Sequence, residues 1–489
     1  MPGKVFIETF TLTLKVNSFN NLIHFILNDK SIATDLPPGM VMLDFVRYHQ
    51  HLKGTKIGCR EGDCGACTLL VGQLINGELK YESMTSCLMP LGNAQGKHIV
   101  SIEGINFPDE LNPIQEAMAE EGGTQCGFCT PGFVVSLAGF CLGNAEATQQ
   151  NAIAAIDGNI CRCTGYKPIE RAAGKVAMIM QSKSDKEVID FVTTKKILPA
   201  YFSSIKNRLQ ALITDEKPIH HLPAGRQGSP LTTHMVGGGT DLYVQKHEEM
   251  VDADIHFVFD RPPMNGIRKE DNKCMMGPSV TVSDLKSSPL INEAISGFHR
   301  IAKLISSTPI RNMATIAGNF INASPIGDFT IFFLALDAQL ILSDGTNKRD
   351  LPLRKLYKGY KSLNKKPTEF IGQIWFTIPD KHTFFHFEKV SKRTHLDIAS
   401  VNSAICIKMN ADVIEQAGLS AGGVGPVPMY LKKTSDFLQG KKVSDEVIEK
   451  AIEIMKTEIS PISDARGSKE YKTLLLTQLI KAHFIEILK

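Results

Sequence analysis

The sequence predicts an α+β protein of several domains, and three observations lead to that class. The chain has 489 residues and 43% hydrophobic content, which is too long for a single core. Stretches with the two-residue alternation of strands and stretches with the spacing of amphipathic helices both occur along it. Nine of the eleven cysteines lie between Cys59 and Cys163, so the first third of the chain differs in chemistry from the rest.

Composition and charge exclude several classes of protein. The 54 basic and 51 acidic residues leave a formal net charge of +3, which gives no electrostatic basis for binding nucleic acid or an anionic membrane. The first 19 residues carry polar and acidic side chains where a secretory signal needs an unbroken apolar run. The most apolar stretch, residues 331–342, is too short for a bilayer and contains Asp337. We therefore expect a cytoplasmic protein with no membrane segment and no nucleic-acid partner.

The first set of four cysteines has the spacing C-x4-C-x2-C-x19-C, which is typical of plant-type ferredoxins that hold a [2Fe-2S] cluster. Its members are Cys59, Cys64, Cys67 and Cys87. Glycines at positions 58, 62 and 65 let the backbone turn closely and point its N–H groups toward sulfur. A structural zinc site and ordinary core cysteines are the alternatives. Zinc loops usually carry two CxxC knuckles, so the spacing favours iron and sulfur.

The residues around this set predict a small β-grasp-like domain. Residues 22–37 read as a hairpin and residues 40–52 as an amphipathic helix. Residues 66–83 read as two strands joined by a turn at Asn76 and Gly77, a pair typical of tight hairpins.

A second set of four cysteines follows in a stretch with helical patterns. Cys126 and Cys129 form a CxxC pair, and Cys161 with Cys163 forms a CxC pair. Thr130 followed by Pro131 predicts an N-cap and the first helical residue, which puts the CxxC pair at a helix start that favours negative charge. Residues 113–123 predict another helix, ended by glycine. By itself this spacing fits zinc almost as well as iron–sulfur, and the neighbouring first set favours iron–sulfur.

Cys141 is the remaining cysteine of this region. It lies on the apolar face of the helix predicted after Pro131, so we interpret it as a buried structural residue.

Two later segments have the composition of a nucleotide site. Glycines 237–239, with Thr240 and Asp241, lie between a predicted strand and a predicted helix, where bare N–H groups can face a pyrophosphate. In residues 310–340, small residues and amides precede an apolar helix. A tight turn and a structural loop are the respective alternatives. The chain has neither G-x-G-x-x-G nor G-x-x-x-x-G-K, so a dinucleotide would be bound in another way.

One apparent motif argues for a different activity. Gly418, Ser420 and Gly422 spell G-x-S-x-G, and Asp464 and His483 follow in the order of an α/β-hydrolase. That motif needs a helix directly after the serine, which the prolines at positions 426 and 428 prevent. We therefore expect no hydrolase triad.

The cysteine motifs carry a clear family resemblance. "CREGDCGACTLL", "QCGFCTPGF" and "NICRCTGYKPIERAA" resemble the two iron–sulfur domains of the xanthine dehydrogenase and aldehyde oxidase family. The resemblance implies one [2Fe-2S] cluster for each set of four cysteines. "VGGGTDL" and "ATIAGNFINASPIGD" resemble the FAD-binding segments of the same family. "TEFIGQIWFTIP" and "FEKVSKRTHLDIASV" extend the match toward the isoalloxazine ring.

Carried over by position, the resemblance implies sixteen residues around FAD. They are Val236, Gly237, Gly238, Gly239, Thr240, Asp241, Leu242, Ala314, Thr315, Gly318, Asn319, Ile321, Asn322, Asp328, and, near the ring, Ile371 and Lys389.

The patterns and the resemblance divide the chain into four domains and a linker. They are a β-grasp ferredoxin-like [2Fe-2S] domain (1–103), a helical [2Fe-2S]-binding domain (104–182), a linker (183–200), an α+β FAD-binding domain (201–382) and an α+β C-terminal cap domain of strands followed by two helices (383–489).

The resemblance also implies a function. In that family the helical cluster lies nearer a molybdenum cofactor and the ferredoxin-like cluster nearer the flavin. Because the chain ends at Lys489, we expect the molybdopterin centre on a separate large subunit. We expect electrons to pass through both clusters to FAD and on to NAD+, in the oxidation of hypoxanthine and xanthine to urate, within a dimer of heterodimers.

Alternatives remain open at this point. The same assembly could oxidise an aldehyde, nicotinate or an aromatic thioester, and oxygen or a ferredoxin could replace NAD+. A zinc-stabilised binding scaffold without redox activity is the alternative from another class.

Overall fold

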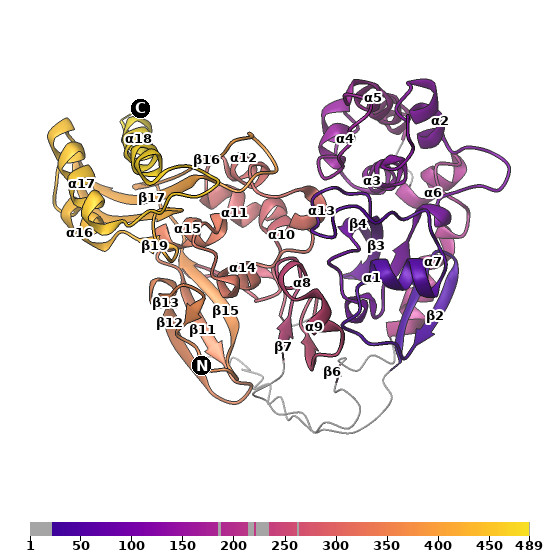
Figure 1. Cartoon of the computed structure of the whole chain (residues 1–489), viewed down its shortest axis with the longest axis horizontal. Helices are drawn as coiled ribbons and strands as arrows, with labels where there is room; N and C mark the ends of the chain where they lie inside the picture. The colour runs from indigo at the N-terminus through magenta and orange to yellow at the C-terminus, as the bar shows by residue number, and fades with distance from the viewer. Residues whose placement is uncertain (1–21, 184–186, 214–219, 222–233, 262–263, 489) are drawn as a thin grey trace, which may run out of the picture.

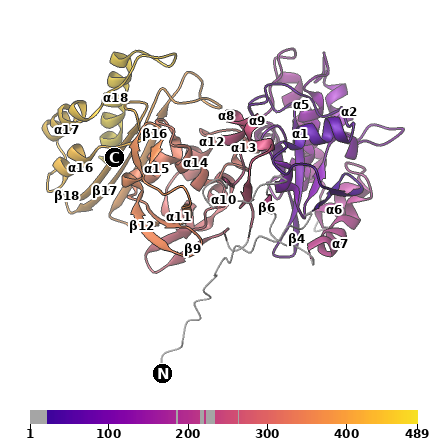
Figure 2. The ribbon, with the colours of Figure 1, turned by 60° about the horizontal axis from the view of Figure 1, so that its bottom comes forward.

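The computed structural model describes residues 22–183, 187–213, 220–221, 234–261 and 264–488. The described residues form two lobes that lie side by side (Figure 1). One lobe contains both cysteine sets, and the other contains the glycine segment and everything after it. A view turned by 60° shows the same two lobes, with helix α13 (Thr308–Arg311) at the boundary between them (Figure 2).

A five-stranded sheet forms the first part of the cysteine lobe. Its strands are β1 (Ile23–Leu27), β2 (Lys30–Thr34), β3 (Thr68–Ile75), β4 (Glu78–Thr85) and β5 (His98–Val100). Their order is β2-β1-β5-β3-β4, and only the β1–β5 pair is parallel. Asn76 and Gly77 join β3 and β4 with φ angles of 52° and 80°, as a tight hairpin turn requires. The predicted hairpins and β-grasp order are confirmed.

Short helical segments pack against this sheet. They are α1 (Met42–Asp44), the π-helical η1 (Phe45–His49), and the 3-10 turns η2 (Leu91–Ala94) and η3 (Ile102–Gly104). The helix predicted over residues 40–52 is therefore shorter and ends in a π-turn. Residues 50–67, which follow it, form the irregular loop that carries three of the first four cysteines.

Four helices form the second part of the cysteine lobe. They are α2 (Pro113–Glu120), α3 (Thr130–Leu142), α4 (Gln149–Ala155) and α5 (Lys167–Gln181). Asn112 and Gln115 start α2 with a reciprocal capping box. Ten of the thirteen residues of α3 are buried, so α3 is the central helix of this bundle.

The start of α3 differs from the prediction. Cys129, rather than Thr130, is the N-cap residue, and Pro131 is the second helical residue instead of the first. The Thr130 hydroxyl makes a 2.6 Å hydrogen bond with the Thr124 hydroxyl, so it does not cap the helix. The cysteine pair still lies at the helix start, as predicted.

Residues 187–200 of the predicted linker are structured. They include α6 (Val188–Thr194), whose Phe191 and Val192 are buried against the helical bundle. The next helix, α7 (Phe202–Ile213), packs on the ferredoxin-like sheet through Ile205 and Leu209. The domain boundaries stay a prediction, but α7 contacts the cysteine lobe rather than the FAD-binding region to which the prediction gave it.

The second lobe begins with a small sheet around the glycine segment. Its elements are β6 (His220–His221), β7 (His234–Val236), α8 (Leu242–Gln245), α9 (His247–Val251) and β8 (Ile255–Phe257), with strand order β6-β8-β7. The strand, glycine and helix order predicted for this segment is confirmed.

A larger sheet with helices on it forms the centre of this lobe. The sheet order is β12-β11-β15-β10-β9. Its strands are β9 (Ile267–Glu270), β10 (Lys273–Met276), β11 (Gln339–Ser343), β12 (Lys348–Pro352) and β15 (Phe370–Thr377). The helices are α10 (Val282–Ser287), α11 (Pro289–Ala294), α12 (Phe298–Lys303), α13, α14 (Ile316–Asn322) and α15 (Asp328–Ala335). The turn η4 (Leu353–Lys355) and the hairpin β13 (Tyr357–Gly359) and β14 (Ser362–Leu363) complete it.

An antiparallel sheet and three helices close the lobe. The strands are β16 (Thr383–Val390), β17 (Val401–Asn410), β18 (Val413–Gly422) and β19 (Met429–Tyr430). The helices are α16 (Lys432–Leu438), α17 (Asp445–Glu458) and α18 (Lys469–Ile487), one more than predicted. Helix α15 is apolar on all sides because it packs between this sheet and the core of the larger one. Among the described residues, no helix combines the length and the apolar character needed to cross a bilayer.

Candidate functional site

The first four cysteines lie together, in two pairs. Cys59 and Cys64 form one pair, in which each backbone N–H donates to the sulfur of the other at 3.4 Å. Cys67 and Cys87 form the second pair through a hydrogen bond between their thiols. Both members of the second pair are buried, with 2% and 1% exposure. Two strands position this site, since Cys67 directly precedes β3 and Cys87 follows the end of β4.

In each of these two pairs, the hydrogen bond between the thiols favours the thiolate form of one member only. The pKa of Cys59 is lowered to about 5, mainly by a hydrogen bond from Cys64, with further bonds from backbone N–H groups. A hydrogen bond from Cys87 likewise lowers the pKa of Cys67 against the effect of burial. The same hydrogen bonds, together with burial, raise the pKa of Cys64 and of Cys87, so only one thiol of each pair is favoured as the thiolate, the form that ligates metal.

Two glycines are required in this loop for different reasons. Gly62 has φ of +80°, and a Cβ there would lie 2.6 Å from the Ile310 side chain. Gly65 has φ of +67°, and its Cβ would lie 2.3 Å from the Gly158 carbonyl oxygen. The predicted need for a close turn is confirmed, and the close neighbours belong to other domains.

The same loop contains a charged residue that sequence reasoning missed. Arg60 has φ of +58°, a conformation that non-glycine residues rarely adopt. Its guanidinium group donates to both carboxylate oxygens of Asp44, at 2.7 and 3.2 Å. The bidentate pair fixes the cysteine loop to α1. No sequence signal links these two positions, which are 16 residues apart.

The second four cysteines also lie in two pairs. The sulfurs of Cys126 and Cys163 are 3.6 Å apart, and both residues are exposed. Cys129 and Cys161 share a hydrogen bond between their thiols. Desolvation is the largest influence on Cys161 and opposes ionisation, yet hydrogen bonds from Thr164 give its pKa a net lowering. Cys141 is fully buried inside α3, away from these pairs, as predicted.

The two-and-two pairing fits a two-iron cluster. In a [2Fe-2S] centre held by four cysteines, each iron takes two thiolates. A tetrahedral zinc ion instead gathers four ligands around one point. The pairing of the sulfurs fits a diiron centre in each set, and that these eight cysteines are the ligands stays a prediction.

The two cysteine sets contact each other through backbone groups. The Ile160 N–H donates to the Cys64 carbonyl oxygen at 3.0 Å. The Asn159 side-chain amide donates to the Gly65 carbonyl oxygen at 3.1 Å. Each contact joins a residue of the first cysteine loop to a residue just before Cys161.

The glycine segment of the second lobe lies against the first cysteine set. A Cβ at Gly239 would be 2.9 Å from the carbonyl oxygen of Leu88, the residue after Cys87. Asn93 donates to the Gly237 carbonyl oxygen at 2.9 Å. Within the described residues, no acceptor takes a hydrogen bond from the backbone N–H groups of residues 237–242. These N–H groups fit the predicted role of holding the phosphates of FAD.

The two predicted FAD segments meet at this point. A Cβ at Gly238 would lie 1.8 Å from the Met313 carbonyl oxygen, so only glycine fits there. Thr315 caps α14 by accepting from the Gly318 N–H at 3.1 Å, and its side chain faces Gly237. Among the other predicted residues, Val236 is buried, Leu242, Ala314 and Ile321 are partly buried, and Thr240 follows the glycines.

Polar residues of these segments hold the elements together. Asn319 accepts from the N–H and the hydroxyl of Thr330, which joins α14 to α15. The Asn322 side chain accepts from Gln245 at 3.0 Å and from Lys361 at 2.8 Å. Desolvation raises the pKa of Asp241, and the charge of Lys361 opposes that rise. Sequence reasoning missed Lys361, because it reaches the site from a hairpin 39 residues after Asn322.

Asp328 and Lys389 form a buried pair. The Lys389 ammonium group lies 2.8 Å from an Asp328 carboxylate oxygen and 3.0 Å from the Leu304 carbonyl oxygen. Asn402 donates to the other Asp328 oxygen. Ile371 lies in β15 opposite Leu342 and is 3% exposed, within the lobe's core. That these residues line FAD stays a prediction.

The hydrolase motif does not form a triad, as expected. Ser420 lies within β18, and its hydroxyl donates to the Ile331 carbonyl oxygen at 2.6 Å. His483 contacts Ser403 at 3.1 Å instead, and Asp464 pairs with Lys472 at 2.8 Å.

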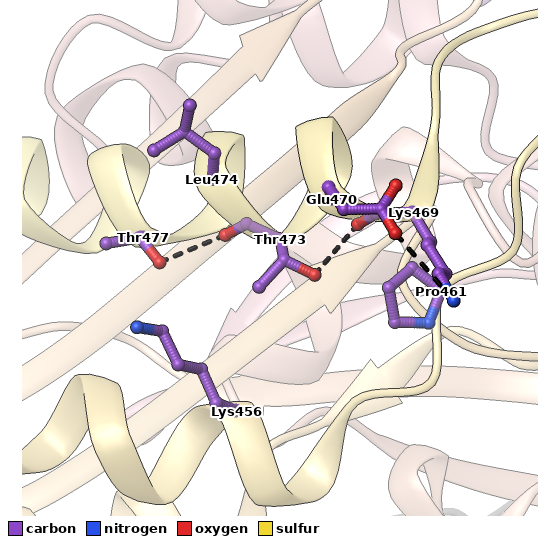
Figure 3. A pocket seen from close by; sticks show the side chains of 7 residues that line it. All are labelled: Lys456, Pro461, Lys469, Glu470, Thr473, Leu474 and Thr477. Atoms are coloured by element: carbon purple, nitrogen blue, oxygen red, sulfur yellow. Dashed lines mark hydrogen bonds and ion pairs between the residues drawn. The ribbon is translucent and has the colours of Figure 1, made fainter.

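A surface cavity of about 510 Å³ lies between α17 and α18, far from the cysteines (Figure 3). It is lined by Lys456, Pro461, Lys469, Glu470, Thr473, Leu474 and Thr477. The two threonines donate to carbonyl oxygens of their own helix, so these polar groups are already used. The cavity contains none of the predicted site residues.

Four family models match consecutive parts of the chain. They are the 2Fe-2S iron-sulfur cluster binding domain (25–91), the [2Fe-2S] binding domain (101–174), the FAD binding domain in molybdopterin dehydrogenase (229–380) and the CO dehydrogenase flavoprotein C-terminal domain (386–487). The first two cover one cysteine set each, and the third covers both glycine-rich segments.

Curated relatives match along most of the chain. Xanthine dehydrogenase from Emericella nidulans is 28% identical over 91% of this chain and 36% of its own length. Aldehyde oxidase 1 from Macaca fascicularis is 24% identical over 96% of this chain and 39% of its own length. The chain thus spans less than half the length of these relatives.

Solved structures overlap with about half of the chain. Carbon monoxide dehydrogenase from Hydrogenophaga pseudoflava has a TM-score of 0.49 and 23% identity, over 52% of this chain and 88% of that one. Quinoline 2-oxidoreductase from Pseudomonas putida 86 has a TM-score of 0.48 and 18% identity, over 53% and 90%.

The paired sulfurs, the glycine segments and the domain matches define an iron–sulfur flavoprotein that binds two [2Fe-2S] clusters and FAD. The order of the four domains and the relatives narrow this class further. In its four domains and their order, the chain is similar to the iron–sulfur and flavin part of the xanthine dehydrogenase and aldehyde oxidase family.

Proposed function

We propose that this chain carries electrons from a molybdopterin centre on a large partner subunit, through the helical cluster and then the ferredoxin-like cluster, to FAD and NAD+. The observation that carries this proposal is the series of contacts between the three sites. Cys64 touches the loop before Cys161, and Leu88, next to Cys87, touches the FAD glycine segment. FAD, when bound, exchanges one or two electrons and so links single-electron clusters to a two-electron acceptor.

The direction of this route rests on exposure. Cys126 and Cys163 are exposed, whereas Cys67 and Cys87 are buried on the side of the FAD segment. An exposed cluster edge is suited to accept electrons from another chain, and a buried cluster is suited to pass them inward. The proposed partner subunit would therefore cover the exposed cysteine pair.

We propose hypoxanthine and xanthine as the substrates, oxidised to urate on the partner subunit with water as the oxygen source. The similarity to xanthine dehydrogenases supports this choice. An aldehyde is the second candidate, supported by the similarity to an aldehyde oxidase. The assembly is proposed to be a cytoplasmic dimer of heterodimers.

The acceptor can be tested on this chain alone. Anaerobic addition of NADH to the purified chain, loaded with clusters and FAD, should bleach the flavin absorbance and then part of the cluster absorbance. A chain that is reduced by dithionite but not by NADH would contradict NAD+ as the acceptor. Oxygen and a ferredoxin would then be tested by following their reduction.

The substrate requires the partner. Co-expression with its molybdopterin subunit should give xanthine-dependent NAD+ reduction. Activity with an aldehyde, nicotinate or an aromatic thioester, and none with xanthine, would reassign the substrate and leave the electron route intact.

A further inference from the structure

The four residues that directly precede Cys161, residues 157–160, contact the first cysteine loop, the helical bundle and the flavin lobe. Asn159 donates to the Gly65 carbonyl oxygen in the first cysteine loop and accepts from Ser136 of α3 at 2.7 Å. Ile160 donates to the Cys64 carbonyl oxygen. Asp157 and Gly158 face the other lobe, where a Cβ at Gly158 would lie 2.7 Å from the ring of Pro309. This segment, residues 157–160, is named the junction.

Arg311 is the residue that holds the junction from the flavin lobe. Its side chain is 3% exposed, and one of its nitrogens lies 2.6 Å from an Asp157 carboxylate oxygen. The same nitrogen donates to the Thr308 hydroxyl at 2.7 Å. The Thr308 N–H donates to the other Asp157 oxygen at 2.7 Å. Both oxygens of the carboxylate are thus bound by the start and the end of α13.

The remaining guanidinium nitrogen of Arg311 binds backbone. It donates to the carbonyl oxygens of Ile305 and Ser306, the first at 3.0 Å. Arg311 therefore binds a partly buried carboxylate and two carbonyl groups at once, which the single ammonium group of lysine cannot reproduce in the same planar geometry. Both terminal nitrogens of the side chain are used within the protein, so we do not assign it to a ligand.

The neighbours of Arg311 in the sequence contact the first cysteine loop and the FAD glycine segment. Ile310 packs on Gly62 of the first cysteine loop. Asn312 donates to the Ser83 carbonyl oxygen of β4 at 2.8 Å. The Met313 carbonyl oxygen lies against Gly238 of the FAD segment. One short stretch, residues 308–313, thus touches the junction, the first cysteine loop and the FAD glycine segment.

We propose that Arg311 and Asp157 form a positioning pair that fixes the separation of the two clusters and FAD. The inference rests on the proposed electron route, in which one electron at a time leaves the reduced helical cluster and reduces the ferredoxin-like cluster. Electron transfer weakens steeply with distance, so a small shift of the junction slows it without changing any ligand. The pair touches no cofactor and acts through the loops that it holds.

The test uses the full chain, loaded with both clusters and FAD, in four forms. They are the wild type, Arg311→Met, Arg311→Lys and, as a matched control, Arg349→Met. Arg349 also forms a two-bond pair with a carboxylate, that of Glu369, but both residues belong to the flavin lobe. Iron, acid-labile sulfide and FAD contents are measured first, so that only loaded protein is compared.

Two measurements follow on reduced protein. The magnetic interaction between the two reduced clusters, measured by electron paramagnetic resonance, reports their separation without turnover. Rapid mixing with NADH, which delivers its electrons at FAD, followed in the cluster absorbance, reports transfer between the centres. We expect Arg311→Met to weaken the magnetic interaction and to slow transfer about tenfold or more. Arg311→Lys should give an intermediate effect, and Arg349→Met should match the wild type.

Several outcomes would overturn the inference. Loaded Arg311→Met protein with an unchanged magnetic interaction and unchanged transfer would do so. If this variant fails to load, Asp157→Asn, which keeps the shape of the side chain, decides the question by the same two measurements. If the wild type itself shows no two cluster signals, the proposed function fails first, and that result is separate from any difference among the variants.

Discussion

The two lobes bind their cofactors by opposite means. In the cysteine lobe, eight sulfur side chains are the predicted ligands, and they lie in pairs. In the flavin lobe, the central feature is the absence of side chains. Gly238 leaves room for the Met313 carbonyl oxygen, and the N–H groups of residues 237–242 take no acceptor within the described residues. Removing a cysteine sulfur should therefore abolish a cluster site, whereas adding a Cβ to a glycine should abolish the FAD site.

This contrast predicts that damage to one kind of site leaves the other intact. The largest expected effect is the loss of a whole cluster. In Cys67→Ser, a buried ligand is replaced by a poorer one, so about half of the iron should be lost. FAD content should stay near that of the wild type. Iron analysis and the electron paramagnetic resonance of the reduced chain measure the two effects.

Two cysteines provide controls for this experiment. Cys163→Ser should remove the other cluster signal and leave the first. Cys141→Ala should leave both signals, because Cys141 is buried in α3 apart from the sulfur pairs. If Cys67→Ser also released FAD, the two lobes would not bind their cofactors independently.

Adding one carbon atom in the flavin lobe should have the next largest effect. In Gly238→Ala the new Cβ would lie 1.8 Å from the Met313 carbonyl oxygen, so the backbone must move. Losing one N–H bond to a phosphate weakens FAD binding by about tenfold or more. Iron content should not change. Gly359→Ala is the control, since nothing lies within 4 Å of a Cβ there. Equal FAD affinity in both variants would contradict the backbone interpretation.

The third expected effect is on stability, and it concerns the buried ion pair of Lys389 and Asp328 in the flavin lobe. Lys389 is 2% exposed, and its removal in Lys389→Met leaves the carboxylate of Asp328 without its cation. We expect the free energy of unfolding to fall by about 3 kcal/mol, measured by denaturation of the loaded chain. Lys442→Met, which breaks a pair with Asp412 at the surface, should change it little. Similar losses of unfolding free energy in both variants would show that burial does not strengthen the contribution of the Lys389–Asp328 pair to stability.

The smallest expected effect depends on pH. Desolvation lowers the pKa of the buried His483 to about 3, and its neighbour His386 adds to the lowering. An unfolded histidine has a pKa of about 6.5, so between these values the unfolded state binds more protons. Stability is therefore present above pH 6.5 and is lost as the pH falls, by up to about 1.4 kcal/mol per unit. His483→Gln should flatten this slope between pH 7 and 5.5.

The control for this measurement is His382→Gln, because His382 is exposed. It should keep the slope of the wild type. A wild-type slope in His483→Gln as well would mean that other groups cause the pH dependence.

The two cluster-binding domains could be predicted from sequence because metal chemistry fixes both residue type and spacing. Cys59 and Cys64 must be close in the chain to reach one small cluster, and the glycines between them follow from the same constraint. The flavin segments gave weaker signals, since glycine and threonine also occur in ordinary turns. There the family resemblance, rather than local chemistry, identified the residues.

The contacts between domains could not be predicted. Arg311 lies in a segment that the sequence singled out, but its partner Asp157 is 154 residues away. Arg60 and Lys361 were missed for the same reason, because their partners meet them only in the folded chain. Helix α7 was assigned by its place in the sequence, although its apolar residues pack on the earlier sheet. Pairing over such distances leaves no local pattern.

The exposed pair of Cys126 and Cys163 has a practical consequence for handling the protein. Their sulfurs are 3.6 Å apart and open to solvent. In chain that has not yet received iron, air can oxidise two such thiols to a disulfide. That bridge would occupy two of the four ligands and block assembly of this centre, while the buried Cys67 and Cys87 are shielded from oxidants. The presence of a reductant during expression and purification should therefore determine how much of the chain assembles the cluster of the helical domain.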